Sequence, residues 1–505
     1  MKSISKHKIS VIKAPVTISA FLTENITSQI LEKIIISNYD LILLPGFVQW
    51  DTSKIEEKFS IQIRKGPEFA SDLPEILNNL DETELSTSIP ANKLFEESGE
   101  NIYHQLLKKQ IEKAKNEICH HTFYLREDKS DLIIGKNLPP PIIAEIVNCP
   151  EKSNPKILNK AKHYIESGAK IIDIGCVSNK PDPGRVKEII SLIRSEYDVL
   201  VSIDSMDQKE LKAAVDEDID LILSLDMGCY KEFLDLPKDI PIVILPTNLK
   251  NAYFPKEPEV RVKNLFNLTK ELQKNGFQKI IADPLLETPI TPGICNSLNS
   301  YFLYKKQIKL EKNKGLEVPL FFGISNVVEL MDIDSVGING LLASIAAELD
   351  ISILFTVEHS PKLFGGVREL KDSIKLNYLA KYKNTPPINQ GLSLFKAKGK
   401  VNQKIPSIKE NNAIIVDDLI PDYQPDEKGY FRIFLNQIQR KIYVLFYSNK
   451  DILLHAYSGE NAEALSKEII KQEISDDLYH LNYLGRELKK AEICLLLGKP
   501  YIQDE

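Results

Sequence analysis

Eight short runs rich in Ile, Val and Leu alternate with amphipathic helical segments between residues 142 and 372. This alternation is typical of a parallel sheet covered by helices, and the nearly continuous apolar letters indicate strands buried on both faces. Eight strands over about 230 residues predict a closed (β/α)8 TIM barrel. The runs are Ile142–Asn148, Ile171–Gly175, Val199–Asp204, Asp220–Asp226, Pro241–Thr247, Lys279–Asp283, Pro319–Ser325 and Ile351–Val357.

Apolar residues at helical spacing follow most of these strands, so the same segment also predicts the outer helices of the barrel. The predicted helices are 155–167, 183–195, 208–216, 259–275, 295–313, 340–349 and 367–381.

The N-terminal segment has an α/β pattern of its own. Strand-like runs at Ile9–Ile12, Asp40–Leu44 and Ile61–Arg64, with a helical segment at Asn25–Ser37, predict a small doubly wound, Rossmann-like α/β domain. A further helix is expected at 101–118, just before the barrel.

The C-terminal segment predicts a small α+β domain. Strand-like runs at 430–435, 441–447 and 452–457 are separated by short links, as in hairpins, and helical patterns begin at Asn461 and Asp476. The predicted units are an N-terminal domain at 1–135, the barrel at 136–382, a polar linker at 383–411 and the C-terminal domain at 412–505.

Composition and charge exclude some classes of binding partner. A net charge of -7 and a pI near 5.8 argue against a nucleic-acid partner, which would require clustered basic residues. No apolar run reaches the length of a membrane span and the N-terminus lacks the apolar core of a signal peptide, so we expect a cytoplasmic protein with no membrane partner.

Polar residues collect at the carboxyl ends of the predicted strands, the face where barrel enzymes build their sites. Turn preferences alone explain some of these positions. They do not explain a carboxylate inside an apolar run, such as Asp173 in Ile-Ile-Asp-Ile-Gly, because a buried charge is costly without a partner. The residues at these strand ends are Asn148, Asp173, Asp204, Asp226, Thr247, Asp283, Asn326 and His359.

Four of the six cysteines, Cys149, Cys176, Cys229 and Cys295, also follow strand ends. They form no Cys-x-x-Cys pair, which argues against a disulfide framework or a zinc ribbon. We interpret them as small packing residues, with a rim metal as the alternative.

Five short motifs occur in order at the ends of the predicted strands. They are Ile146-Val-Asn148-Cys-Pro-Glu-Lys-Ser153, Ile172-Asp173-Ile-Gly175, Ser202-Ile-Asp204-Ser205, Ala282-Asp283-Pro284 and Glu358-His359. Their order resembles the pterin-binding family of dihydropteroate synthases and methyltetrahydrofolate-dependent corrinoid methyltransferases. With Leu44-Pro-Gly46 and Lys65-Gly-Pro67 in the N-terminal segment, the whole chain is similar to archaeal dihydropteroate synthase-like proteins associated with tetrahydromethanopterin.

The resemblance implies roles for individual residues. Asp204 and Asp283 would bind the pterin, helped by Asp226, Ser224 and Asn326, because carboxylates accept the N–H groups of its amidine-like edge. The resemblance further implies catalytic roles for Asn148, Asp173 and His359. Asn148 would bind Mg²⁺, and His359 would stabilise a departing diphosphate.

The chain departs from the synthase pattern at two basic positions. Where synthases have a Ser-Arg-Lys type run after the seventh strand, this chain has Gly323-Ile-Ser325-Asn326-Val327, and Val357 replaces a basic residue two places before His359. We expect other cations on the same rim to bind the phosphate groups. They are Lys152, Lys180, Arg185, Lys362 and Arg368.

Three functions therefore remain open. The first is a synthase that joins a hydroxymethyl-dihydropterin diphosphate to an arylamine, which in tetrahydromethanopterin synthesis carries a ribose phosphate. The second is a methyltransferase acting on a methylated pterin, favoured by Ser325-Asn326-Val327, although the chain lacks a corrinoid-binding Asp-x-His-x-x-Gly run. The third is a non-catalytic pterin-binding subunit.

Barrels of this family commonly pair through their outer helices, so a homodimer is expected.

Overall fold

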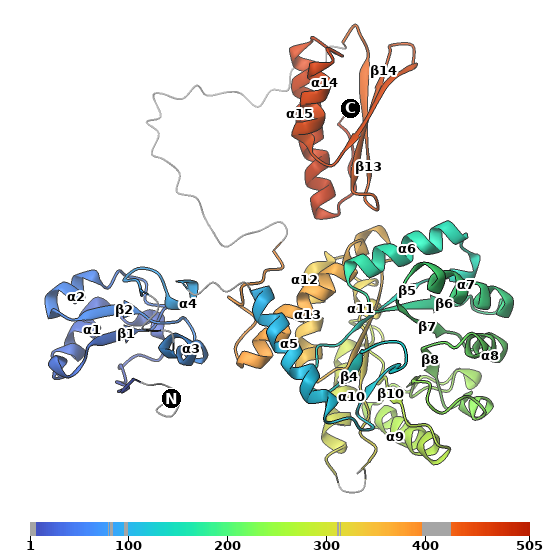
Figure 1. Ribbon diagram of the computed structural model, residues 1–505, viewed down its shortest axis with the longest axis horizontal. Coiled ribbons are helices and arrows are strands. Elements are labelled where there is room, and N and C mark those ends of the chain that lie inside the picture. Colours follow the sequence, from blue (N-terminus) through green and yellow to red (C-terminus); the bar gives the residue numbers. More distant parts are fainter. Residues whose placement is uncertain are drawn as a thin grey trace.

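The computed structural model describes residues 7–78, 80, 84–94, 99–310, 313, 315–395 and 426–504. Figure 1 shows a small N-terminal unit, a central barrel and a C-terminal unit. Within these residues, no helix has the length and apolar character needed to cross a membrane.

The central unit is the predicted (β/α)8 barrel. Neighbouring strands pair in parallel in the order β10-β9-β8-β7-β6-β5-β12-β11, and a bridge between Ala282 and Leu320 joins the two ends of this sheet. All eight predicted strands are therefore present and the barrel is closed. The strands are β5 Ile142–Ile146, β6 Ile171–Gly175, β7 Leu200–Asp204, β8 Leu221–Leu225, β9 Ile242–Ile244, β10 Ile280–Ala282, β11 Phe321–Gly323 and β12 Ile353–Val357.

The predicted helices are present close to their expected positions. No helix was predicted after the fourth strand, and after β8 the chain forms only a short 3-10 turn at Tyr230–Phe233 before β9. The barrel helices are α6 Asn154–Ser167, α7 Pro183–Glu196, α8 Gln208–Asp216, α9 Pro258–Lys274, α10 Ile294–Gln307, α11 Ser325–Val328, α12 Ser335–Glu348 and α13 Gly366–Lys383.

Local sequence fixes where these helices begin and end. Asp182 caps α7 by accepting a hydrogen bond from the Arg185 amide, and Pro183 takes the first turn, where no amide donor is needed. Gly168 ends α6 in the left-handed region at φ 115°, a conformation that favours glycine.

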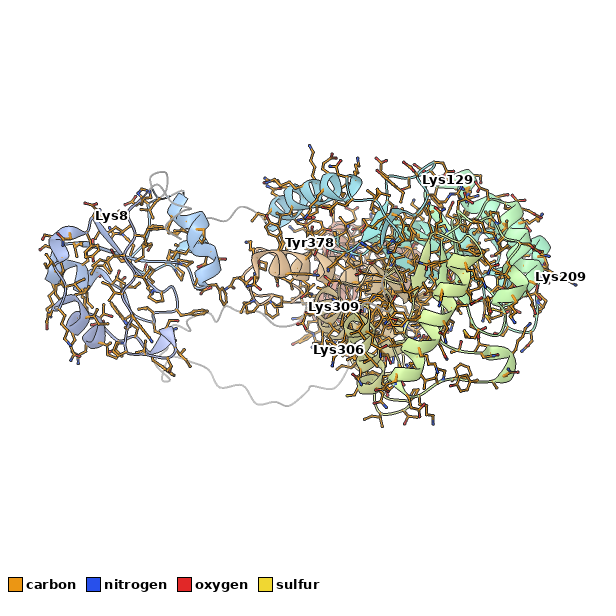
Figure 2. The ribbon with its side chains drawn as sticks, turned by 90° about the horizontal axis from the view of Figure 1, so that it is seen from below. Lys8, Lys129, Lys209, Lys306, Lys309 and Tyr378 are labelled. Carbon is orange, nitrogen blue, oxygen red and sulfur yellow. The ribbon has the colours of Figure 1, made fainter. Side chains whose placement is uncertain are left out.

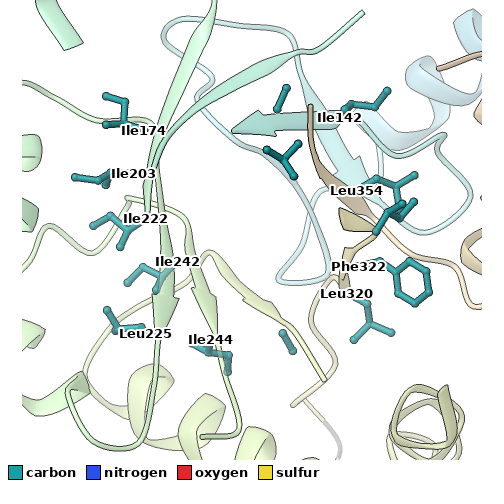
Figure 3. Packing of buried hydrophobic residues seen from close by; sticks show 14 of the residues in the cluster. Ile142, Ile174, Ile203, Ile222, Leu225, Ile242, Ile244, Leu320, Phe322 and Leu354 are labelled. Atoms are coloured by element: carbon teal, nitrogen blue, oxygen red, sulfur yellow. The ribbon is translucent and has the colours of Figure 1, made fainter. Parts of the chain in front are cut away.

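The strands bury apolar side chains against the surrounding helices. Figure 3 shows side chains of β6, β7 and β8, including Ile174, Ile203 and Ile222, pointing away from one side of the barrel, and Ile142 and Leu354 pointing away from the other. This outward core explains the continuous apolar letters of the runs, because the alternate residues point into the lumen.

The lower half of the lumen is also apolar, and a hairpin that the sequence pattern did not predict closes it. Strands β3 Thr122–Tyr124 and β4 Ile133–Gly135 pair in antiparallel fashion, and Phe123, Leu125 and Ile134 cluster with the first inward residues of the barrel strands. The carboxyl ends of the strands are left as the polar end of the lumen.

Helix α5 Gly99–Lys115 packs against α13, and the rings of Tyr103 and Tyr378 lie 5.7 Å apart. Tyr378 lies on the flank of the barrel beside α5 (Figure 2). A cavity of about 210 Å³ near Lys113 and Ala343 lies on this flank, away from the strands' carboxyl ends. Helix α5 packs on α13, and the hairpin shares an apolar cluster with the barrel strands, so both pack on the barrel although they precede the predicted boundary at residue 136.

The N-terminal unit is smaller than a doubly wound domain. Its strands β1 Leu41–Leu44 and β2 Gln62–Lys65 form a two-stranded parallel sheet. The predicted strand at Ile9–Ile12 is not formed, since these residues are irregular and Val11 is 78% exposed. The helices of this unit are α1 Glu24–Leu31, α2 Ser53–Phe59, α3 Leu73–Asn78 and α4 Ala91–Leu94.

The C-terminal unit has three antiparallel strands and two helices that cover one face of the sheet. Its elements are β13 Tyr430–Asn436, β14 Lys441–Tyr447, β15 Leu453–Gly459, α14 Ala462–Lys471 and α15 Leu478–Leu497. Much of the predicted linker and the predicted start of this domain at residue 412 fall between 396 and 425, outside the described residues.

Candidate functional site

The alternation of side chains along the barrel strands places carboxylates on the lumen. In β5 and β6, Ile143 and Ile171 belong to the inward apolar cluster, and the next inward residues are Glu145 and Asp173, which are partners in the ladder. By the same alternation Asp204 at the end of β7 and Asp283 just after β10 point inward. Asp173 and Asp283 are buried, whereas Glu145 and Asp204 are partly exposed.

Asp173 is the deepest of these carboxylates, with no exposed surface. Its Oδ1 accepts a hydrogen bond from the Ser202 hydroxyl at 2.6 Å, and its Oδ2 has no hydrogen-bond partner among the described residues. Burial, and then the charges of Asp204 and Glu145, raise the pKa of Asp173 well above its usual range. Asp173 therefore favours the neutral form in the ligand-free site.

Glu145 was not among the predicted site residues. Its carboxyl lies over Gly175 on β6, whose ladder partner is Asp204. Burial, then Asp204 and Glu329, raise the pKa of Glu145 to about 7, and Lys152 opposes the shift. The sequence signal was available, because Glu145 interrupts an apolar run in the same way as Asp173.

Asp204 and Ser224 are brought together, as the resemblance implied. Ser224 has a φ of 68° where the pairing of β8 with β9 shifts register, and its side chain lies near enough to Asp204 to affect the carboxyl. Burial raises the pKa of Asp204, and the Ser224 hydroxyl opposes the rise.

Asp283 has one oxygen occupied and one open. Its Oδ1 accepts hydrogen bonds from the Leu285 amide at 2.8 Å and the Tyr301 hydroxyl at 3.0 Å. No hydrogen bond to Oδ2 is found within the described residues, so this oxygen is left to meet a ligand. Burial raises the pKa of Asp283 to about 7, against the opposing effect of its two donors and of Arg261.

Arg261 positions the loop that carries Asp283. It is 1% exposed, and its guanidinium donates to the carbonyls of Pro255 and Leu285, at 2.8 and 3.1 Å, and to the Glu287 carboxylate at 2.5 Å. Because Leu285 has a φ of 68°, these bonds hold the loop in a conformation that few residues adopt. Sequence reasoning missed Arg261, which looks like an ordinary polar residue within a helix.

Asp226 differs from its predicted role. One oxygen accepts the amides of Gly228 and Cys229, and the other accepts the Thr247 hydroxyl and the Leu249 amide. Four hydrogen bonds occupy a carboxylate with no exposed surface, so Asp226 joins the loops after β8 and β9 and has no oxygen free for a pterin.

Asn148 and His359 are exposed at the strand ends. Asn148 adopts the left-handed conformation at φ 48°. His359 follows Glu358, which accepts hydrogen bonds from His163 at 2.8 Å and from the Val367 amide at 3.0 Å. Burial alone would raise the pKa of Glu358, but these donors lower it, and the charged Glu358 anchors the strand end beside His359.

Asn326 lies on the same rim. Its amide donates to the Leu286 carbonyl at 2.9 Å, which ties α11 to the loop that carries Asp283.

The predicted phosphate-binding cations differ in their exposure and in the ion pairs and hydrogen bonds that they form. Lys152 is partly buried near Glu145, and it forms no ion pair within the described residues. Arg185 instead supports its loop, donating to the Lys152 carbonyl at 2.8 Å and pairing with Glu188. The other three lie at the surface: Lys180 pairs with Glu151, Lys362 donates to the Met331 carbonyl, and Arg368 is exposed.

A magnesium ion fits at Asn148 only if substrate oxygens supply some of its other ligands. Mg²⁺ keeps several waters and often takes one or two protein oxygens, and the exposed Asn148 amide can supply one. No group of three or more His, Cys, Asp or Glu side chains is arranged to bind a metal in the described part of the chain. Of the rim cysteines, Cys149 and Cys229 are buried, and burial raises the pKa of the Cys149 thiol to about 12.

Comparison with known proteins adds independent findings. The pterin binding enzyme family model matches residues 149–357, and the PterinBD-DUF4346 family model matches residues 425–504. The uncharacterized protein MJ0107 of Methanocaldococcus jannaschii is 32% identical over 510 residues, which cover 98% of this chain and 94% of that protein. The dihydropteroate synthase of Streptococcus pyogenes is 32% identical over 110 residues, covering 19% of this chain and 41% of that enzyme.

Among solved structures, a Xanthomonas albilineans dihydropteroate synthase in complex with indole-2-carboxylic acid and 6-chloroguanine has a TM-score of 0.39 at 16% identity, covering 49% of this chain and 94% of that one. A Yersinia pestis synthase with a pterine-sulfa conjugate has a TM-score of 0.37 at 17% identity, covering 48% and 94%. The match to MJ0107 over nearly the full length and the match of the barrel to the pterin binding enzymes together place the protein: the chain belongs to the dihydropteroate synthase-like family of pterin-binding proteins.

Proposed function

We propose that the polar end of the barrel binds a pterin, and that the protein joins a 6-hydroxymethyl-dihydropterin diphosphate to an arylamine with release of diphosphate. One observation carries the proposal: four inward carboxylates, from β5, β6, β7 and the end of β10, surround a lumen whose opposite end is filled by apolar side chains.

The carboxylates match the chemistry of a pterin edge. The ring presents N–H donors that need acceptors in an enclosed site, and charge-assisted hydrogen bonds to carboxylates are roughly twice as strong as neutral ones. The open Oδ2 of Asp283 and the partly exposed carboxyl of Asp204 are the acceptors within reach of a ligand. Asp173, beneath them, would meet the part of the ring that reaches deepest.

The leaving diphosphate requires positive charge at the polar end of the barrel. Lys152 is partly buried and close enough to Glu145 to lower its pKa, and His359 is exposed at the end of β12, next to the loop where barrels commonly bind phosphate. Mg²⁺ bound to the diphosphate and to the Asn148 amide would neutralise charge on the leaving group. In this arrangement Lys152 and His359 orient the diphosphate away from the attacked methylene carbon.

For the arylamine we propose 4-(β-D-ribofuranosyl)aminobenzene 5'-phosphate, as in tetrahydromethanopterin synthesis. The support is the sequence resemblance to archaeal synthase-like proteins and the exposed Arg368 and Lys362 on the rim, which could meet its phosphate. Homodimer formation is part of the same proposal.

Methyl transfer from a methylated pterin is the second candidate. It is favoured by Ser325-Asn326-Val327, where synthases have a Ser-Arg-Lys type run, and the Asn326 amide lies beside the Asp283 loop. A pterin-binding subunit without catalysis would share the carboxylates and differ only in turnover.

One assay separates these functions. The purified chain is mixed with Mg²⁺, the dihydropterin diphosphate and either 4-aminobenzoate or the ribosylated arylamine phosphate, and diphosphate release is measured. Synthase activity predicts release that depends on the arylamine and is lost in Asp204→Asn and Asp283→Asn. Pterin binding without release would leave the other two functions, and absence of pterin binding would contradict all three.

A further inference from the structure

Strand β15 leaves one edge of the C-terminal sheet unpaired. The strand order is β13-β14-β15, so β15 has a neighbouring strand on one side only. In the part of the chain that the structure describes, β14 is the only element that hydrogen-bonds the backbone of β15. The N–H and C=O groups on the outer side of β15 are therefore open to pairing with another strand.

The opposite edge of the sheet, on β13, is closed by a side chain. The Ile433 amide donates to Oε1 of Gln503 at 2.9 Å, and Nε2 of Gln503 donates to the Phe431 carbonyl at 2.9 Å. The Gln503 side chain thus makes the two hydrogen bonds that a neighbouring strand would otherwise make at this position. Arg432 lies between the two bonded residues, and a charged residue on an edge strand also opposes pairing.

Strand β15 has neither form of protection among the described residues. It reads Leu-Leu-His-Ala-Tyr-Ser-Gly from Leu453 to Gly459, without proline and without Lys, Arg, Asp or Glu. Ile452, Leu453 and Leu454 are 59%, 49% and 48% exposed. An edge strand that is exposed, apolar and uncharged is a site of association with another strand.

The charges at the two ends of β15 indicate which strand pairs with it. Lys450 precedes the uncharged run and Glu460 follows it; both are exposed, and neither forms an ion pair within the described residues. Asp451 turns away from this edge, because its carboxylate accepts the Tyr430 hydroxyl at 2.6 Å and Tyr430 lies on β13, beyond β14. A second β15 that runs antiparallel brings opposite charges together at both ends, so the strand is complementary in charge to itself.

We propose that β15 pairs antiparallel with β15 of a second copy of this chain, around a two-fold axis at His455. Lys450 of each copy then lies beside Glu460 of the other. The pairing joins two three-stranded sheets into one, with the helices of both copies on the same face. It makes no use of the polar end of the barrel, so it does not rest on the proposed pterin site.

The register also matches apolar residues across the axis. Opposite residues of an antiparallel pair share a face of the sheet, so Leu454 meets Ala456 of the second copy and Leu453 meets Tyr457 of the second copy. Tyr457 packs against the core between the sheet and its helices. Leu453, half exposed in a single copy, is thereby covered at the edge of that core.

Hydrogen exchange of the full chain, measured by mass spectrometry, reports the pairing at β15 itself. The outward amides of β15 exchange freely in a single copy, whereas pairing protects them. We expect the peptide that contains residues 450–460 to exchange more slowly as the protein concentration rises about a hundredfold, because association depends on concentration. A homodimer formed through the barrel helices would not protect these amides, so the two kinds of pairing are distinguished.

Charge reversal tests the antiparallel register. Lys450→Glu and Glu460→Lys each replace two attractive contacts with two repulsive ones, so each alone should weaken pairing by roughly tenfold at low ionic strength. The double variant, Lys450→Glu with Glu460→Lys, should pair as the wild type does. An equimolar mixture of the two single variants should also pair, because each chain then meets opposite charges at both ends of the strand.

Lys428→Glu is the matched control, since it changes the net charge equally. Lys428 is exposed, lies before β13 and pairs with Asp476 at 2.9 Å, so this variant should keep the wild-type concentration dependence. Absence of concentration-dependent protection of β15 in the wild type overturns the inference. Pairing of both single variants as tight as that of the wild type, or failure of the double variant and the mixture to restore it, overturns it as well.

Discussion

The Oε1 atom of Glu145 lies over the α-carbon of Gly175, so close that a Cβ at position 175 would overlap it. Gly175 is in extended backbone within β6, and its φ is not in the left-handed region. Glycine is therefore required here for space and not for backbone freedom. It lets a carboxylate from β5 reach across β6 toward Asp204 on β7.

Gly175→Ala should push Glu145 out of place. We expect a loss of about 1 to 3 kcal/mol in the free energy of unfolding, typical of overpacking, together with weaker pterin binding. Urea unfolding and a binding titration measure the two effects. Gly337→Ala, in α12 with no atom near the new Cβ, is the control and should be neutral or slightly stabilising. Equal effects in both variants would contradict the packing role of Gly175.

Glu145→Gln should stabilise the ligand-free protein at high pH. The folded-state pKa is about 7, above the usual value for Glu, so the folded protein binds more protons than the unfolded chain between about pH 4.5 and 7 and loses stability as the pH rises through this window. The variant should gain about 1 to 3 kcal/mol over the wild type at pH 8 and little at pH 4.5. Denaturant unfolding at both pH values tests this, and a gain that is equal at both would refute it.

Tyr301→Phe should weaken pterin binding most at neutral pH. Its hydroxyl lowers the pKa of Asp283, so its loss raises that pKa above about 7 and leaves more of the carboxyl neutral at pH 7. We expect affinity to fall several-fold at pH 7 and to recover toward pH 8.5, as Asp283 ionises. Tyr304 lies on the same helix as Tyr301 and donates its hydroxyl to the Leu316 carbonyl. Tyr304→Phe is therefore the control and should keep the wild-type pH profile.

Asp220→Ala should destabilise the barrel without changing the site at the polar end of the lumen. The buried carboxylate accepts hydrogen bonds from Arg126 at 3.2 Å and Lys129 at 2.7 Å in the β3–β4 hairpin loop, and from Arg194 on α7 at 2.9 Å. These bonds join the hairpin loop to the barrel. Removing it takes away the ion pair of Arg194, one of the carboxylates that pair with Arg126 and Lys129, and the acceptor of the Val201 amide. We expect a loss of about 3 kcal/mol in the free energy of unfolding.

Thermal and urea unfolding test this prediction. Asp216→Ala, which removes an exposed carboxylate paired with Lys187, should cost less than about 1 kcal/mol. Pterin affinity of the folded fraction should not change in either variant, and a selective loss of affinity in Asp220→Ala would contradict a purely structural role.

His359→Ala should slow turnover more than it weakens pterin binding, because its proposed partner is the departing diphosphate and not the ring. The comparison of kcat with the dissociation constant of 6-hydroxymethylpterin measures the split. A parallel loss in both quantities would show that His359 acts on the pterin.

The site was only partly predictable from residue patterns. Positions at the strand ends predicted that Asp173, Asp204 and Asp283 would collect at one end of the barrel, but Glu145, which interrupts an apolar run as Asp173 does, was not predicted. Asp226 has the same kind of position at a strand end, yet four loop hydrogen bonds occupy it. Which carboxylates are free depends on loop conformations that strand patterning does not specify.

By itself, the sequence determined the barrel, because eight apolar runs spaced by helices have few other ways to bury both faces. Only the tertiary structure decided that the hairpin at 122–135 fills the lower lumen, since strands of three residues carry no readable period. The tertiary structure likewise decided the charge of the site. The ionisation of Glu145 depends on Asp204, fifty-nine positions away, and such a distance in sequence becomes a contact only when β5, β6 and β7 lie side by side.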